Sequence, residues 1–293
     1  MKTILTFILI ITTITTASAQ LLTDEELETK KIYSSFEDAL DNPSDVYVME
    51  IGFDSFDPSN GDTVIPPEIF DLPNLQKLNF TYGGPYLKEI PSEIKRADKV
   101  TDMSIFLCSW VEEVPPEINE LKNLRHLYIS HCPIRELPDI GQLQQLQTLC
   151  IWSCPLEELP PSLTQLQKLE VLEVHGSLQH KNDVRDTLFM PISALPEDMG
   201  NMTNLKYLDL SYTRVQYLPA SIVNCSNLTE ISLKGTCFDN IPEQLFELAT
   251  IVDHDVLLRC HNGQFHKIVH QSKRESVGIR VHSETYYAEF ILK

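Results

Sequence analysis

The sequence predicts an α/β repeat solenoid, and two regularities support this fold class. Pairs of an aliphatic residue and proline recur along most of the chain, with the prolines at positions 66, 91, 115, 138, 160, 196, 219 and 242. Six of the seven intervals are 22 to 25 residues long, and the seventh, of 36, contains an insertion. An apolar frame of the form L-x-x-L-x-x-L-x-L also recurs once in every unit. A fixed period of this length indicates short units that bury their apolar sides by stacking on one another.

The last step of the frame, L-x-L, has the two-residue period of a strand with one buried side. Leu127 with Ile129, and Leu149 with Ile151, are typical copies. Alternate strand residues face opposite sides of a sheet, so these side chains should point inward and those between them outward. The proline pair then brings the chain back along the other side of the solenoid. We therefore expect about eight to nine units over residues 46–256, with parallel strands on the concave face.

This frame resembles the leucine-rich repeat family, in particular secreted bacterial members with L-P-x-x-I units of about 23 residues. The resemblance implies a horseshoe-shaped solenoid and says little about the ligand. Most family members have Asn in the turn after each strand. The matching positions here are Cys108, Cys132, Cys154, Ser177, Thr213 and Thr236. We expect Cys132 and Cys154 to be buried thiols that behave as small apolar groups.

The first 19 residues have the features of a secretory signal peptide. Lys2 precedes an apolar run from Ile4 to Ile14, and small residues follow up to Ala19. The run is too short for a bilayer, which needs about 20 apolar residues. We expect cleavage after Ala19 and a secreted or periplasmic protein. No cysteine follows the run that could carry a lipid anchor, and no later segment is apolar enough to insert into a membrane.

Both ends of the solenoid need caps, because terminal repeats would otherwise expose their core. Residues 20–45 predict a helical cap with N-caps at Thr23, paired with Glu26, and at Ser35, paired with Asp38. Five apolar residues are expected to cover the first repeat: Leu27, Ile32, Tyr33, Phe36 and Leu40. Residues 257–293 lose the frame and predict a β-rich cap, with alternating stretches at 277–281 and 286–292.

The seven cysteines are too few for a dense disulfide scaffold, and their odd number leaves at least one thiol unpaired or paired between chains. Cys237 and Cys260 each lie four residues beyond the last frame residue of successive units. A bridge between them would close the C-terminal end of the solenoid. Free thiols at both positions are the alternative.

The sequence predicts no enzyme and no cofactor. Serine-hydrolase, zinc-protease and phosphate-loop motifs are absent. Cys150 and His126 both fall on the concave side, but a flat sheet offers a nucleophile little exclusion of water. Ligand types that suit zinc occur together in the C-terminal region, but their spacing matches no standard site, so we predict no metal there: Cys260, His261, His266 and His270.

The outward positions of the predicted strands form the candidate binding site on the concave face. They include an aromatic and histidine cluster that folding does not require, with an acidic part beside it. The nine candidate residues are Phe106, His126, Tyr128, His131, Trp152, Glu173, His175, Tyr207 and Asp209. Exposed aromatic clusters are common at the energetic centres of interfaces. The alternative is that these rings only pack against one another.

The net charge of −19 argues against nucleic acid and anionic membranes as partners. We therefore expect a monomeric recognition protein that binds a protein or peptide, with the acidic part favouring a basic segment. Glycan or cell-surface adhesion through the same rings is an alternative. An enzyme using the cap or the insertion at residues 178–192 is a remote one. The insertion should hang over one edge of the solenoid, either contacting a ligand or serving as a tolerated surface loop.

Overall fold

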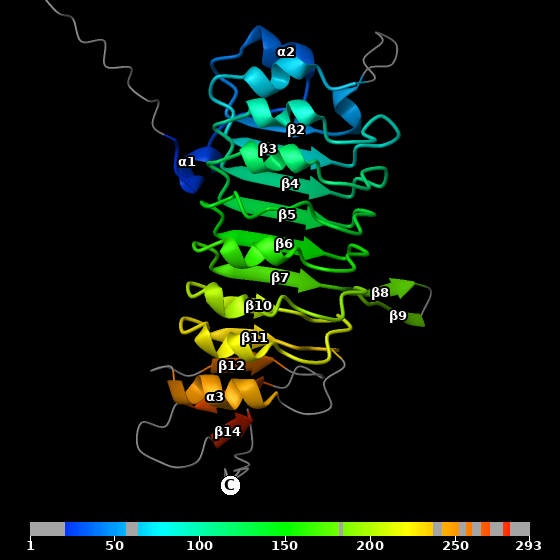
Figure 1. The fold of residues 1–293 in the computed structure, drawn as a ribbon. Coiled ribbons are helices and arrows are strands. Elements are labelled where there is room, and N and C mark those ends of the chain that lie inside the picture. Colours follow the sequence, from blue (N-terminus) through cyan, green and yellow to red (C-terminus); the bar gives the residue numbers. More distant parts are fainter. Residues whose placement is uncertain are drawn as a thin grey trace, which may run out of the picture.

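The computed structural model describes residues 21–56, 64–181, 184–236, 242–251, 256–259, 265–269 and 278–281. Among these residues, one 12-stranded sheet runs the length of the molecule, and its strands follow chain order apart from a separate two-stranded hairpin (Figure 1). The strands of the large sheet are β1 (Ile32–Tyr33), β2 (Val48–Ile51), β3 (Lys77–Thr81), β4 (Asp102–Phe106), β5 (His126–Ser130), β6 (Thr148–Trp152), β7 (Val171–His175), β10 (Tyr207–Asp209), β11 (Glu230–Ser232), β12 (Val256–Arg259), β13 (Phe265–Val269) and β14 (Gly278–Val281).

The L-x-L step of the frame forms β2 to β7, β10 and β11, as predicted. Neighbouring strands from β1 to β12 pair in parallel, and the register aligns frame residues of successive units, as in Leu127 with Leu149 and Leu149 with Leu172. The aligned column is fully buried: Leu78, Met103, Leu127, Leu149, Leu172, Leu208 and Ile231. Each unit therefore closes the core of the unit before it, which explains why the frame repeats so strictly.

Most segments that return the chain between strands contain a short 3-10 helix, whereas the return between β5 and β6 contains only turns. Five of these helices begin directly after the proline of their unit, and the sixth, η6, begins three residues after it: η2 (Pro67–Asp71), η3 (Ser92–Arg96), η4 (Pro116–Glu120), η5 (Pro161–Gln165), η6 (Met199–Asn201) and η7 (Ala220–Asn224). A unit of about 23 residues leaves room for only one or two helical turns, and 3-10 geometry is favoured in such short pieces. Proline suits this position because its fixed φ fits a helix start and the missing N–H is not needed there.

The turn after each strand has a repeated conformation. The residue that follows the strand, or that lies soon after it, has a positive φ in most units: Tyr82, Leu107, His131, Ser153, Tyr212 and Gly235. Only Gly235 adopts this left-handed region without a steric cost from a Cβ atom. Strand β7 is different, because Gly176 leads directly into the insertion.

The cysteines of these turns form a ladder of buried thiols. Cys132 Sγ donates to the carbonyl oxygen of Ser130 at 3.2 Å, and Cys154 Sγ donates to that of Trp152 at 3.4 Å. Later in the solenoid Thr213 Oγ1 donates to Leu210 O at 2.7 Å. Cys132 and Cys154 are each 2% exposed and free, which confirms the prediction of buried thiols. The thiols add a second hydrogen bond to carbonyls that already accept from a neighbouring unit, since Leu107 N donates to Ser130 O and His131 N donates to Trp152 O.

Two short helices precede the first full repeat. Thr23 caps α1 (Asp24–Glu28) in the predicted capping box with Glu26, and Ser35 caps α2 (Phe36–Asp41) by accepting from the Asp38 amide. Tyr33 and Phe36 are buried in the core, as predicted, but two further expectations are wrong. Ile32 is 57% exposed and Leu40 is 37% exposed, because only one side of β1 and of α2 faces the repeats.

Leu27 is also buried, but in a different place from the expected one. Helix α1 lies beside the amino ends of β3 and β4 rather than over the first repeat (Figure 1). Leu27 lines a groove there with residues of β3 to β5, including Met103 and Tyr128. The first helix therefore covers part of the sheet face and not the end of the solenoid.

At the C-terminal end the strand direction changes. β12 continues the parallel sheet, whereas β13 and β14 pair antiparallel. β14 coincides with the alternating stretch predicted at residues 277–281, but β13 was not anticipated from the sequence. Helix α3 (Glu243–Ile251) replaces the last 3-10 return. Several predicted features lie outside the described residues: the expected signal peptide, Cys237, Cys260, His261, His270, the stretch 286–292 and the side chain of His266.

The insertion forms an antiparallel hairpin of β8 (Ser177–Lys181) and β9 (Val184–Leu188). It projects from the edge of the solenoid at the carboxyl end of β7 (Figure 1), where the sequence placed it. None of the described helices is long and apolar enough to cross a membrane.

Candidate functional site on the open face of the sheet

The open face of the sheet is the side opposite the buried Leu column. Strand register divides its side chains, which stand at the outward positions of the frame, into three columns. The first column is Lys77, Asp102, His126, Thr148, Val171, Tyr207 and Glu230; the middle one is Asn79, Ser104, Tyr128, Cys150, Glu173, Asp209 and Ser232; the third is Thr81, Phe106, Ser130, Trp152 and His175. All nine candidate residues lie in these columns, except His131, which lies in the turn directly after β5.

Four of the candidate rings form a connected row across β5, β6 and β7. His126 stacks on Tyr128 with ring centroids 6.4 Å apart, and Tyr128 meets the edge of Trp152 at 6.5 Å. Trp152 in turn stacks on His175 at 5.7 Å. These four residues, which we call the aromatic row, are each half-buried. The rings therefore do pack on one another, but they keep part of their surface available to a partner.

A second, smaller group of rings lies next to the row. Phe106 contacts Tyr82 at 5.6 Å and His131 at 6.0 Å between centroids, both edge-on. Tyr82 is 60% exposed, and His131 is also exposed. Ser130 Oγ lies 2.7 Å from His131 Nδ1, which orients that ring. Phe106 and His131 thus extend the aromatic surface from the third column to the turns at the edge of the sheet.

Glu173 fixes the orientation of the indole at the centre of the row. Trp152 Nε1 donates to Glu173 Oε2 at 2.8 Å, from β6 to the neighbouring strand β7. A hydrogen bond to a carboxylate is stronger than one between neutral groups. The indole is therefore held in one position before any partner arrives, which lowers the entropy lost on binding.

The open face is less exposed in its middle than the strand period predicts. Cys150 was expected at a partly exposed position but is only 3% exposed, because the large side chains of Tyr128 and Glu173 flank it in the same column. Ser130 and Ser232 are buried as well. A two-residue period gives the direction of a side chain, but the size of its neighbours on adjacent strands decides how much surface it exposes.

The burial of Cys150 also bears on whether this thiol and His126 could act together as a nucleophile and a base. Burial, followed by the nearby Glu173 carboxylate, raises the pKa of the Cys150 thiol well above its ordinary value. A thiol needs the opposite shift to act as a nucleophile at neutral pH. In the register Cys150 pairs with Tyr128, whereas His126 pairs with Thr148. The geometry therefore gives no support to nucleophilic catalysis by this pair.

The phenol of Tyr128 has a raised pKa. Burial raises its pKa to about 12, with smaller contributions from Cys150 and nearby carboxylates. Its hydroxyl is therefore protonated at neutral pH and remains a hydrogen-bond donor. A tyrosine that combines an apolar ring with a protonated hydroxyl is a frequent contact residue in interfaces.

The acidic part of the face follows on β7 and β10. Asp209 Oδ1 accepts from the Ser211 amide at 2.8 Å, and its Oδ2 accepts from Tyr207 Oη at 3.3 Å. Glu173 and Asp209 are neighbours in the middle column. The register therefore brings two half-buried carboxylates together next to the aromatic row, as the sequence predicted.

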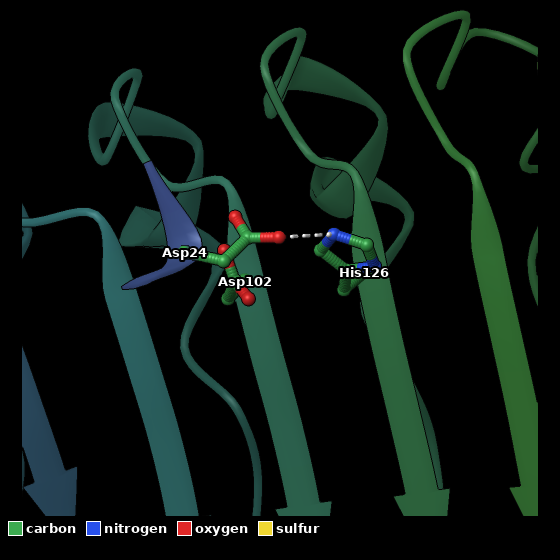
Figure 2. A group of neighbouring side chains, drawn as sticks. All are labelled: Asp24, Asp102 and His126. Carbon is green, nitrogen blue, oxygen red and sulfur yellow. Dashed lines mark ion pairs between the residues drawn. The ribbon is translucent and has the colours of Figure 1, made fainter. Parts of the chain in front are cut away.

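The structure adds a feature that sequence reasoning missed. Helix α1 lies over the first and middle columns at β3 to β5, and the groove beneath it has a volume of about 390 Å³. The Leu22 amide donates to Gln76 Oε1 at 2.7 Å, which ties this segment to the residue before β3. Asp24 Oδ2 lies 3.5 Å from His126 Nε2 (Figure 2). The capping box predicted the helix, but no pattern in the sequence indicated which surface Leu27 would cover.

The continuous parallel sheet, the buried Leu column and the short 3-10 returns define the fold as a leucine-rich repeat solenoid. A family model described as a leucine-rich repeat region matches residues 108–190. The matched segment runs from the turn after β4 to just beyond β9.

Comparison with known proteins agrees with this fold. TMV resistance protein N of Nicotiana glutinosa is 29% identical over 205 residues, an alignment that covers 63% of this chain and 16% of that protein. The chain thus spans only about a sixth of this relative. An internalin of Listeria monocytogenes is 17% identical with a TM-score of 0.52, covering 76% of this chain and 56% of its own. The plant peptide hormone receptor RGFR1 in complex with RGF2 is 18% identical with a TM-score of 0.50, covering 79% and 34%.

Proposed function

We propose that the protein binds another protein or a peptide, without catalysis, through the open face of its sheet. The aromatic row carries this proposal. Four rings from three strands touch one another and keep part of their surface exposed, although the solenoid core does not need them. Oriented, half-exposed aromatic rings are typical of the few residues that supply most of the energy of an interface. Leucine-rich repeat proteins are generally recognition proteins, and the structurally similar receptor was solved with RGF2 bound.

The carboxylates beside the row indicate the chemistry of the partner. Glu173 already accepts from the Trp152 indole, and Asp209 accepts from Ser211 and Tyr207. Each still has capacity to accept further hydrogen bonds from a cation. We therefore propose a partner segment that combines an apolar or aromatic residue with Lys or Arg. Binding should weaken as salt is added, since the charged contacts lie near solvent.

Selection from a displayed random peptide library tests this proposal, because it requires no knowledge of the natural partner. Peptides selected on the purified protein should be enriched in basic and aromatic residues. Replacing Tyr128 and Trp152 together by Ala should weaken their binding at least 100-fold, as expected for two central interface residues. The melting temperature should change little, because neither ring belongs to the Leu column.

A matched double variant serves as the control. Trp110 and Tyr217 are the same residue types, 56% and 50% exposed, and lie outside the three columns of the open face. Replacing both by Ala should leave peptide binding unchanged. Equal losses in the two double variants, or no loss in either, would place the binding surface elsewhere. Selective binding to a glycan array with no peptide selected would instead favour the adhesion alternative.

The proposal also includes export and a monomeric state. Support for export comes from the basic, apolar and small-residue pattern of residues 1–19. Sequencing the amino terminus of protein purified from its native source should give Gln20 as the first residue. Light scattering of the same preparation should give the mass of a single chain.

A further inference from the structure

Three potential metal ligands meet where helix α1 lies on the open face. Asp24 comes from α1, Asp102 from the start of β4 and His126 from the start of β5 (Figure 2). One ligand atom of each residue lies within 4.8 Å of the other two. The three residues are far apart in the sequence, so only the packing of α1 against the sheet brings them together.

The imidazole nitrogens of His126 lack hydrogen-bond partners in the described part of the chain. Both ring nitrogens of His126 are buried, and neither has a hydrogen-bond partner among the described residues. Its Nε2 lies 3.5 Å from Asp24 Oδ2, which is long for a hydrogen bond. A buried polar atom without a partner is costly and usually has a reason, such as a bound ion.

Asp102, in contrast, is positioned by its neighbour. Thr101 Oγ1 donates to Asp102 Oδ2 at 2.7 Å, and Thr101 is fully buried. Outer hydrogen bonds of this kind orient a carboxylate toward a metal. Asp24 is different, since its side chain is 58% exposed and can rotate toward the other two ligands.

We propose that Asp24, Asp102 and His126 form a binding site for a divalent transition-metal ion, with Zn²⁺ as the first candidate. One imidazole nitrogen and two carboxylate oxygens suit Zn²⁺, whereas Ca²⁺ and Mg²⁺ prefer oxygen ligands alone. Ligands about 2 Å from one ion lie about 3–4 Å from each other. Atoms already within 4.8 Å therefore need only small side-chain movements to close around the ion.

A metal ion bound to these three residues would link the amino-terminal segment to the sheet. In its absence α1 is held by the burial of Leu27 and by the Leu22–Gln76 hydrogen bond. The ion would add bonds from α1 to two adjacent strands, and His126 would still stack on Tyr128. The amino-terminal segment would then form a fixed border of the aromatic row. This inference does not depend on the proposed function, because metal binding can be measured without any protein partner.

Calorimetric titration of the full chain with Zn²⁺ tests the site. We expect one ion per chain, and at least tenfold weaker binding in each of Asp24→Asn, Asp102→Asn and His126→Ala. Two matched controls should bind like the unmodified protein. Glu25→Gln changes an exposed carboxylate on the same helix, and His175→Ala removes an imidazole from the same sheet face. Absence of binding, or equal loss in the controls, would overturn the proposal.

Two further readouts separate this site from the cysteines and from loss of folding. Co²⁺ should give weak ligand-field absorption without a thiolate charge-transfer band; a strong charge-transfer band would assign the metal to cysteines and overturn the proposal. Zn²⁺ should slow hydrogen exchange in residues 22–28 of the unmodified protein, but not of His126→Ala. Circular dichroism of each variant should match that of the unmodified protein. Unchanged exchange upon saturation with Zn²⁺ would also contradict the site.

Discussion

The two sides of each strand differ sharply in the side chains that occupy them. On β6, Leu149 and Ile151 point inward and are fully buried, whereas Thr148 and Trp152 point outward and are half-buried. Along the solenoid the inward column contains only Leu, Met and Ile. The middle outward column contains Asn, Ser, Tyr, Cys, Glu and Asp. Stacking thus restricts the inward side to apolar residues, including Phe80 on β3, and leaves the chemistry of the outward side free to vary.

The largest effect on the free energy of unfolding should come from truncating a side chain of the inward column. Leu149→Ala removes a fully buried side chain from the middle of the column. Loss of apolar burial and the remaining cavity should lower the free energy of unfolding by about 2–5 kcal/mol. Urea denaturation followed by circular dichroism measures this change. Because each unit closes the core of its neighbours, the loss should appear as a shift of the main transition.

The neighbouring position gives the matched control. Thr148→Ala changes the outward residue next to Leu149 on the same strand, and should change the free energy of unfolding by less than about 1 kcal/mol. A loss as large as that of Leu149→Ala would mean that the outward side is also a structural core. The division between the two sides of the sheet would then be wrong.

The inward side is also the part that sequence alone predicts well. The L-x-L frame gives strand positions, their parallel register and the columns of the open face. It succeeds because a one-residue shift of a strand would turn every buried Leu to solvent. The capping box of α1 was predictable for a similar reason, since Thr23 and Glu26 satisfy each other's backbone amides locally.

What the sequence did not predict depends on packing between distant segments. The placement of α1 rests on the burial of Leu27 and on the hydrogen bond from the Leu22 amide to Gln76, and no local rule indicates which surface the helix covers. The burial of Cys150 depends on the size of Tyr128 and Glu173 on adjacent strands. The cluster of Asp24 with Asp102 and His126 follows from that placement. The spacing of these three residues in the sequence therefore did not indicate that they would lie together. Long-range contacts of this kind leave no period in the sequence.

An intermediate effect on the free energy of unfolding should come from raising the pH, which ionises buried groups both in the turn ladder and on the open face. Burial raises the pKa of Cys154, in the turn ladder, to about 12 and the pKa of Tyr128, on the open face, also to about 12. The folded state therefore keeps protons that the unfolded chain releases at lower pH. Each group contributes stability that is complete at neutral pH, falls as the pH rises above the unfolded pKa, and is lost by about pH 12.

For Cys154, with an ordinary pKa of 9.0, the loss between pH 7 and pH 10 should be on the order of 1–1.5 kcal/mol. Urea denaturation at pH 7, 8.5 and 10 measures it. Cys154→Ala lowers stability at every pH but should flatten the decline, whereas Tyr128→Phe should flatten it less, because an ordinary tyrosine ionises only near pH 10. An equally steep decline in Cys154→Ala would show that this thiol does not remain protonated in the folded protein.

The smallest effect on the free energy of unfolding should come from Glu173→Gln. This substitution removes a negative charge from the open face but keeps an oxygen acceptor for the Trp152 indole. The free energy of unfolding should change by no more than about 0.5 kcal/mol, since the group lies near solvent and retains its hydrogen bond. Binding of selected basic peptides should weaken and become less sensitive to salt. A destabilisation above about 2 kcal/mol would mean that the carboxylate supports the fold of the sheet. If that occurred, the open face would combine structural and recognition roles at its centre, and the contrast with the inward column would hold only toward its edges.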